Sequence, residues 1–193
     1  MASEPPVPTV VYDACVLYPF SLRNALVQCA VDRLVRARWT RDIHDEWMES
    51  LLEARPRLTR ERLERTRDLM DRAVPDALVT GHHRWVPTVS MPDHEDRHVV
   101  AAAIEAKAVA IVSADRHFRG TDLEPHGLAV WRPNEFLMGL YRADPDALVA
   151  CMANARRNLS RSAPPATDFV AGLRRTSRLG EFCDALERHL QDL

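Results

Sequence analysis

Four acidic residues stand at positions from which a folded chain can bring them together. Asp13 directly follows the apolar stretch TVVY, and Asp115 follows the apolar stretch VAIVSA. Glu46 lies in the second turn of one predicted helix, and Asp96 opens another. Ligands of parallel sheets bind beyond the carboxyl ends of the strands, so Asp13 and Asp115 converge if their strands are neighbours.

Carboxylates in this arrangement predict a divalent metal site. Four such groups repel one another, and burial raises their pKa values further. Mg²⁺ or Mn²⁺ removes this conflict, because both ions prefer oxygen ligands. A metal held in this way activates water and stabilises the leaving oxygen of a phosphodiester.

Each of the four acids also has an ordinary structural explanation. Asp13 fits a turn, Asp96 a helix start, Glu46 a solvated surface and Asp115 a cap. Asp93 and Glu95 are alternatives to Asp96, although the spacing of Asp96 to the buried face that begins at Val99 favours Asp96.

The surrounding pattern predicts an α/β fold with a central parallel β-sheet flanked by helices. Apolar runs predict strands at 8–12, 38–40, 109–115 and 127–131, with an extended segment at 84–90. Helical periodicity predicts helices at 21–38, 41–54, 59–74, 91–108 and 132–141. Strands separated by helices favour parallel connections.

After this region only helical patterns remain. They predict helices at 144–159 and 178–190, joined by a hinge rich in Pro, Ser and Ala at 160–169. We expect a disordered lead at 1–7, a main domain at 8–143 and a C-terminal helical extension at 144–193. The apolar faces of the extension are predicted to pack within the chain or a dimer; they include Leu148, Met152, Leu159, Phe182, Leu186 and Leu190.

Composition excludes several classes of protein. The 193 residues are 46 % hydrophobic and 28 % charged, typical of one globular domain, and no apolar run is long enough for a membrane span. The four scattered cysteines fit neither a zinc site nor a disulfide framework, so a cytoplasmic location is expected. The net charge is only −2, but every basic residue except Lys107 is arginine, which binds phosphates well.

Four blocks of the sequence resemble PIN-domain nucleases, and most closely the VapC-like toxins of bacterial toxin–antitoxin pairs. In order, the blocks are YDACVLYP, IHDEWMESLL, PDHEDRHVVAAAIEAKAVAIVSADRHF and GLAVWRPNEFL. The resemblance covers roughly residues 8–141, and the third block is the most specific.

This resemblance implies a PIN-like fold and an acidic quartet of Asp13, Glu46, Asp96 and Asp115 that binds Mg²⁺ or Mn²⁺. It implies Ser113 as the supporting hydroxyl, cleavage of RNA, an antitoxin partner and a homodimer. Cys15 stands where relatives often carry Asn or Ser, so a supporting hydrogen bond is expected to be lost or weakened. Three arginines near the acids are candidate RNA contacts, with a plain surface role as the alternative: Arg97, Arg116 and Arg119. His94, His98 and His117 are expected to be structural or solvated.

Other functions remain open from the sequence. A non-catalytic PIN-like module could bind nucleic acid or protein, and a housekeeping RNA-processing nuclease would need no antitoxin. A HAD-type phosphatase also has an Asp after its first strand, but it requires a second acid where this chain has Cys15.

Overall fold

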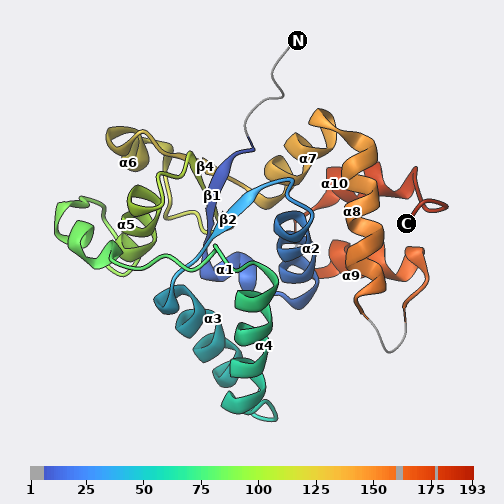
Figure 1. The fold of residues 1–193 in the computed structure, drawn as a ribbon, viewed down its shortest axis with the longest axis horizontal. Coiled ribbons are helices and arrows are strands. Elements are labelled where there is room, and N and C mark those ends of the chain that lie inside the picture. The colour runs from blue at the N-terminus through green and yellow to red at the C-terminus, as the bar shows by residue number, and fades with distance from the viewer. Residues whose placement is uncertain (1–6, 160–162, 177) are drawn as a thin grey trace.

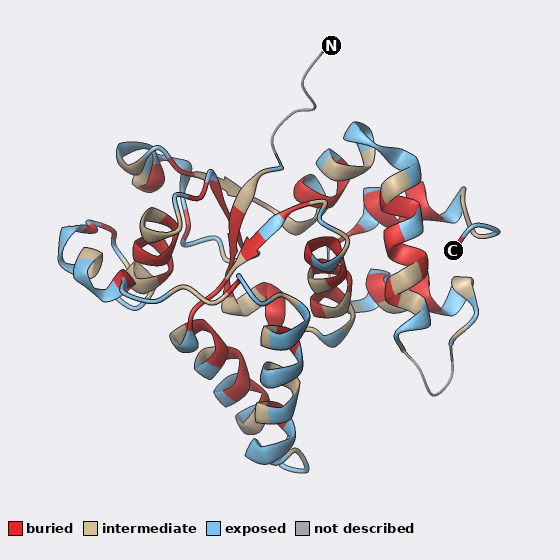
Figure 2. Ribbon diagram, viewed as in Figure 1, coloured by how far each residue is buried: buried red, intermediate tan, exposed pale blue. Residues whose placement is uncertain are grey.

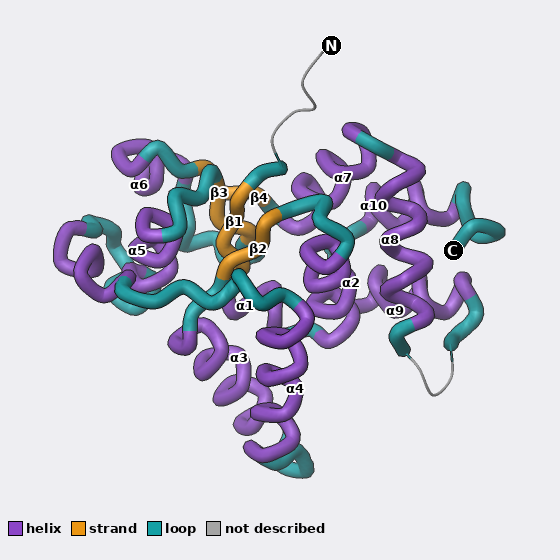
Figure 3. Tube along the Cα trace, in the orientation of Figure 1, coloured by secondary structure: helices purple, strands orange, loops and turns teal. Residues whose placement is uncertain are grey.

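The central element is a parallel sheet of four short strands in the order β2-β1-β3-β4 (Figures 1 and 3). The computed structural model describes residues 7–159, 163–176 and 178–193. The strands are β1 (Thr9–Tyr12), β2 (Arg36–Arg38), β3 (Ala110–Val112) and β4 (Ala129–Trp131). The predicted α/β fold with a central parallel sheet is therefore confirmed.

Helices cover both sides of this sheet (Figure 1). Those of the first half are α1 (Ala14–Leu17), α2 (Phe20–Val31), α3 (Arg41–Ala54), α4 (Arg60–Ala73), the 3₁₀ helix η1 (His82–Thr88) and α5 (Arg97–Glu105). Those of the second half are α6 (Gly120–Leu123), the 3₁₀ helix η2 (Glu124–His126), α7 (Pro133–Ala143), α8 (Pro145–Arg157), α9 (Ala166–Thr176) and α10 (Gly180–Glu187). Helices α5 and α6 lie on the left in Figure 1, α2, α7 and the C-terminal helices lie on the right, and α3 and α4 project below.

The carboxyl edge of the sheet gathers the segments that carry the predicted acids. Because β1 pairs with β3 in parallel, Asp13 N can donate to Val112 O at 3.2 Å, and both strands end side by side. Two residues separate the end of β2 from the start of helix α3 at Arg41. The second of them, Thr40, caps the helix, because its hydroxyl accepts from Ile43 N at 3.1 Å. The sequence prediction of Thr40 as the cap of helix 41–54 is confirmed.

A single hydrophobic cluster joins the sheet to the C-terminal helices (Figure 2). Helix α2 contacts both α8 and α9, and α7 contacts α8 and α10. Of the apolar tail residues, Leu148, Met152, Phe182 and Leu186 are fully buried, and Leu159 and Leu190 pack partly buried against the same cluster. Their predicted packing within the chain is confirmed, whereas the boundary at residue 143 stays a prediction.

The predicted helix at 21–38 is too long. Helix α2 ends at Val31, and Arg33 adopts a left-handed conformation with φ of 61°, after which the chain turns back. Residues 36–38, not 38–40, then pair with β1. The apolar residues that suggested a continuing helix instead lead into an edge strand of the sheet.

Two further predictions before β3 are wrong. Residues 84–90, predicted to be extended, lie largely within the 3₁₀ helix η1, where the Trp85 indole donates to Glu105 Oε2 at 2.6 Å. The helix predicted from residue 91 begins only at Arg97. The preceding acids form a turn instead, in which Asp93 Oδ1 accepts from Glu95 N at 2.9 Å.

The tail also differs from its prediction. Of the predicted hinge, residues 160–162 lie outside the described residues, and residues 166–169 form the first turn of α9. Of the predicted disordered lead, residues 1–6 also lie outside the described residues. Within the described chain, every helix is too short or too polar to cross a bilayer.

Candidate metal centre

An open cleft of about 1380 Å³ lies at the carboxyl edge of the sheet. Its acidic lining, which we call the carboxylate cleft, consists of Asp13, Asp42, Asp45, Glu46, Glu49, Glu53, Asp93, Glu95, Asp96 and Asp115. Among the described residues, no lysine or arginine lines it. All four members of the predicted quartet thus border one cleft.

Asp13 lies at the bottom of the cleft, 5 % exposed, at the junction of β1 and α1. Its Oδ1 accepts from Ala14 N at 2.7 Å, and its Oδ2 accepts from the Ser113 hydroxyl at 2.7 Å. Burial raises the pKa of Asp13, and these hydrogen bonds act in the opposite direction. Ser113 therefore contacts two of the four predicted acids. Its hydroxyl donates to Asp13, and its Oγ accepts from the backbone N of Asp115 at 3.0 Å.

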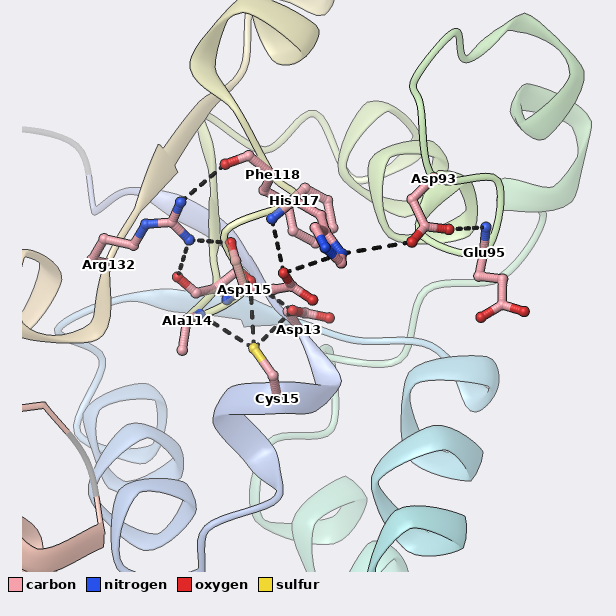
Figure 4. A network of polar contacts seen from close by, with 10 residues as sticks. Asp13, Cys15, Asp93, Glu95, Ala114, Asp115, His117, Phe118 and Arg132 are labelled. Carbon is pink, nitrogen blue, oxygen red and sulfur yellow. Dashed lines mark hydrogen bonds and ion pairs between the residues drawn. The ribbon is translucent and has the colours of Figure 1, made fainter.

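Cys15 supplies the remaining donor to Asp13. Its thiol donates to Asp13 Oδ2 at 2.9 Å, and its sulfur accepts from Ala114 N at 3.2 Å (Figure 4). Burial, followed by the negative charge of Asp13, raises the pKa of Cys15 to about 12, so the thiol stays protonated and able to donate. The supporting hydrogen bond, expected to be lost or weakened at Cys15, is therefore present, with a thiol as a weaker donor than a hydroxyl.

Asp96 is the acid that the protein leaves least satisfied. It precedes the first turn of α5 without capping it, and its Oδ2 is buried without a hydrogen-bond partner among the described residues. Burial raises the pKa of Asp96 to about 6, and the charges of Asp13, Asp93 and Asp115 act in the same direction. A cation is one species that could satisfy this oxygen.

Asp115 and Asp93 meet at His117, on the opposite side of the cleft from α3. Asp115 Oδ1 accepts from His117 N at 2.8 Å, and the His117 ring lies 3.5 Å from Asp115 and 3.7 Å from Asp93 (Figure 4). Asp93, Asp96 and His117 each offer a ligand atom within 4.8 Å of the others. Sequence reasoning weighed Asp93 only as a substitute for Asp96, whereas both line the cleft.

Glu46 differs from the other three predicted acids in its partner, the side chain of the partly buried His98. His98 Nε2 lies 2.8 Å from Glu46 Oε1. Burial lowers the pKa of His98, but the hydrogen bond and charge of Glu46 outweigh it and raise the pKa overall. His98 is thus neither free nor merely solvated, and it holds the Glu46 carboxylate at the wall of the cleft.

A second group of possible metal ligands shares His98 with this pair. His82 is buried and donates to Asp42 Oδ2 at 2.8 Å, and His98 completes a set with ligand atoms within 4.8 Å. The sequence offered no periodic signal for it, since His82 precedes the extended segment predicted at 84–90 and lies where no element was predicted.

The arginines predicted to contact RNA lie outside the carboxylate cleft. Arg97 is partly buried, Arg119 lies in a small hollow with Asp93 and His117, and Arg116 is exposed on the far side of the β3–α6 loop. Sequence reasoning missed Arg132, which follows β4. Its guanidinium donates to the carbonyls of Ser113 (3.0 Å), Phe118 (3.0 Å) and Asp115, and so fixes the loop that carries Asp115 (Figure 4).

Comparison with known proteins decides which family this arrangement represents. Residues 9–117, more than half of the chain, match the PIN domain. The chain belongs to the PIN-domain family. No curated protein and no protein of known structure is significantly similar to it. PIN domains are generally metal-dependent nucleases, so the PIN fold and a nuclease-type acidic site are what the chain shares with its family.

The side chains of this PIN domain fit a divalent cation. The donor set is made of carboxylate oxygens, which hard cations prefer, and one buried oxygen of Asp96 has no donor from the protein. The raised pKa values of Asp13 and Asp96 have the same main cause, burial, and the negative charges of neighbouring carboxylates add to it.

Proposed function

We propose that this PIN-domain protein is a metal-dependent endoribonuclease in which Asp13, Glu46, Asp96 and Asp115 hold Mg²⁺ or Mn²⁺. The observation that carries the proposal is the buried, unpartnered Oδ2 of Asp96 in a cleft that also contains buried Asp13. A protein keeps such a group when something other than its own donors satisfies it. Bound there, the metal would supply an activated water and neutralise charge on a phosphodiester.

The protein's own residues have separate tasks in this proposal. Asp13 is oriented by the Ser113 hydroxyl and the Cys15 thiol, so its carboxylate presents a fixed face to the cleft. Glu46 is held by His98, and Asp115 by the loop that Arg132 fixes. Asp96 remains free of protein donors and responds most directly to a ligand.

The RNA substrate and the biological role rest on the sequence resemblance. Single-stranded or looped RNA fits best, because unpaired bases can splay into an open cleft. The resemblance to VapC-like toxins favours a cytoplasmic, homodimeric toxin neutralised by an antitoxin. A housekeeping nuclease would have no such neutralising partner, and a non-catalytic binding module would leave RNA intact.

The deciding experiment is cleavage of a mixed pool of cellular RNA by the full chain. Wild type, Asp13→Asn and Asp96→Asn are each incubated with Mg²⁺, Mn²⁺ or EDTA. We expect cleavage that needs metal and falls by about 10³-fold or more in both variants, because metal ligation contributes several kcal/mol and each 1.36 kcal/mol is tenfold in rate.

The matched control is Asp146→Asn, an exposed acid at the start of α8 that does not line the cleft. It should cleave like wild type. Cleavage that survives in both cleft variants would eliminate the assigned site, and no cleavage by folded wild type in either metal would favour the binding module.

A further inference from the structure

A second surface hollow of about 860 Å³ adjoins the carboxylate cleft and has the opposite charge. It lies between the β3–α6 loop, the start of α7 and the junction of α9 with α10. Five arginines line this arginine groove: Arg116, Arg132, Arg174, Arg175 and Arg178. No aspartate or glutamate is found among its described lining residues.

Three of these arginines have no partner among the residues that the structure describes. Arg116, Arg175 and Arg178 are exposed, and no described residue forms a hydrogen bond or an ion pair with their side chains. Arg174, in contrast, is neutralised by Asp184 at 2.7 Å and Glu187 at 2.9 Å. The groove therefore presents uncompensated guanidinium groups, which bind phosphates through paired N–H donors.

The groove and the cleft adjoin each other at one shared residue. Cys15 lines both of them, and Ala114 of the groove donates its N–H to the Cys15 sulfur. A polyanion that reaches the cleft therefore has the arginine groove immediately beside it. Ten acids line the cleft, so a nucleic acid is repelled there unless a neighbouring surface attracts it.

We propose that the arginine groove binds the phosphate backbone of single-stranded RNA next to the bond in the cleft. The C-terminal helical region then forms part of the substrate surface, because Arg175 of α9 and Arg178 of the α9–α10 connection lie outside the residues matched by the PIN domain. The proposal rests on the proposed function for the identity of the bond that is cut. It does not require cleavage for binding.

The test measures binding without catalysis. A fluorescently labelled single-stranded RNA of about 12 nucleotides is titrated with the full chain in EDTA, and anisotropy is followed at about 0.1 M salt and at higher salt. The test variant is Arg175→Gln/Arg178→Gln. The control is Arg36→Gln/Arg188→Gln, which removes the same charge from exposed arginines of β2 and the end of α10.

We expect the test variant to bind RNA about tenfold more weakly or worse at this salt concentration. The slope of log affinity against log salt should fall by about 1.4, the value for two lost phosphate contacts to a single strand. The control should remain within about twofold of wild type. All proteins should keep the same melting temperature, since the substituted side chains are exposed and have no partners.

Unchanged RNA affinity in Arg175→Gln/Arg178→Gln would overturn the proposal, even if wild type cleaves RNA. Arginine-dependent binding in a protein that cleaves nothing would support the proposal and count against the nuclease activity instead. A labelled polyglutamate peptide is the third arm. If it binds more tightly than RNA and depends on the same arginines, the groove is a docking site for an acidic protein segment and the RNA proposal fails.

Discussion

The carboxylate cleft and the arginine groove share Cys15, yet they differ in how their charges are held. The cleft buries Asp13 and leaves an oxygen of Asp96 without a donor among the described residues, and burial, followed by the charge of neighbouring carboxylates, raises the pKa of both carboxyls. The groove keeps its unpaired charges on long, exposed arginines. An exposed guanidinium remains hydrated, whereas a buried carboxylate loses its water and must be compensated by fixed donors.

The two regions also come from different parts of the chain. Every acid of the cleft lies before residue 117, within the matched PIN domain. In the groove, Arg132, Arg174, Arg175 and Arg178 lie beyond it. The matched PIN domain thus supplies all the carboxylates of the cleft, whereas the chain beyond it supplies most of the arginines of the groove.

Apart from the loss of a metal ligand, the largest effect is expected from the Cys15 thiol, one of the three donors to Asp13. Cys15→Ala removes the thiol that donates to Asp13 Oδ2, while Cys15→Ser replaces it with a hydroxyl. We expect cleavage to fall about 10- to 100-fold in Cys15→Ala, the usual cost of losing a group that orients a ligand, and by much less in Cys15→Ser. Initial rates of RNA cleavage measure both.

The groove gives the contrast for this prediction. Cys15 also lines the groove, so RNA binding in EDTA should be compared for the same two variants. Equal RNA affinity with unequal cleavage places the role of the thiol in the cleft. Equal loss of cleavage in both variants would indicate that sulfur itself, and not the hydrogen bond, is required.

Asp96→Asn should raise both the stability and the RNA affinity of the metal-free protein, because the negative charge of the cleft lowers both. Without metal, removing one of the crowded charges should raise the melting temperature by about 2–4 °C, corresponding to about 1 kcal/mol after allowance for the partial exposure of the carboxyl. It should also increase RNA affinity in EDTA, the opposite of the effect expected from the groove variant. Differential scanning calorimetry and anisotropy measure the two effects.

The same carboxyl predicts the direction of the pH dependence. The pKa of Asp96 is raised from 3.8 to about 6, so the folded chain binds more protons than the unfolded chain between these values. The resulting stability is fully present below about pH 3.8 and is lost as the pH rises through about 6. In EDTA, wild type should therefore lose more stability than Asp96→Asn between pH 5 and 7, and parallel curves would contradict the assignment.

The sequence predicted the sheet and its acids because both follow simple patterns. Short apolar runs identified β1, β3 and β4, and the position of Asp13 and Asp115 at the strand ends predicted that they share an edge. Thr40 marked the start of α3 because a side-chain cap is a local signal. These features depend on neighbours in sequence.

The remaining features depend on neighbours in space. Trp85 lies in a 3₁₀ helix that contacts α5, where Glu105 accepts its indole N–H, and no local pattern encodes that pairing. The donation from Cys15 to Asp13 depends on burial, which keeps the thiol protonated. Arg175 and Arg178 reach the groove only because α9 packs on α2.

The smallest expected effect concerns Arg116, the one groove arginine supplied by the matched PIN domain. Arg116→Gln should reduce the salt slope of RNA binding by about 0.7, half the change expected for Arg175→Gln/Arg178→Gln, because one phosphate contact is lost in place of two. The ratio of the two changes tests whether both parts of the chain bind the same strand. If Arg116→Gln changes the metal concentration needed for cleavage and leaves the salt slope unchanged, Arg116 acts on the cleft, and the groove belongs to the C-terminal helices alone.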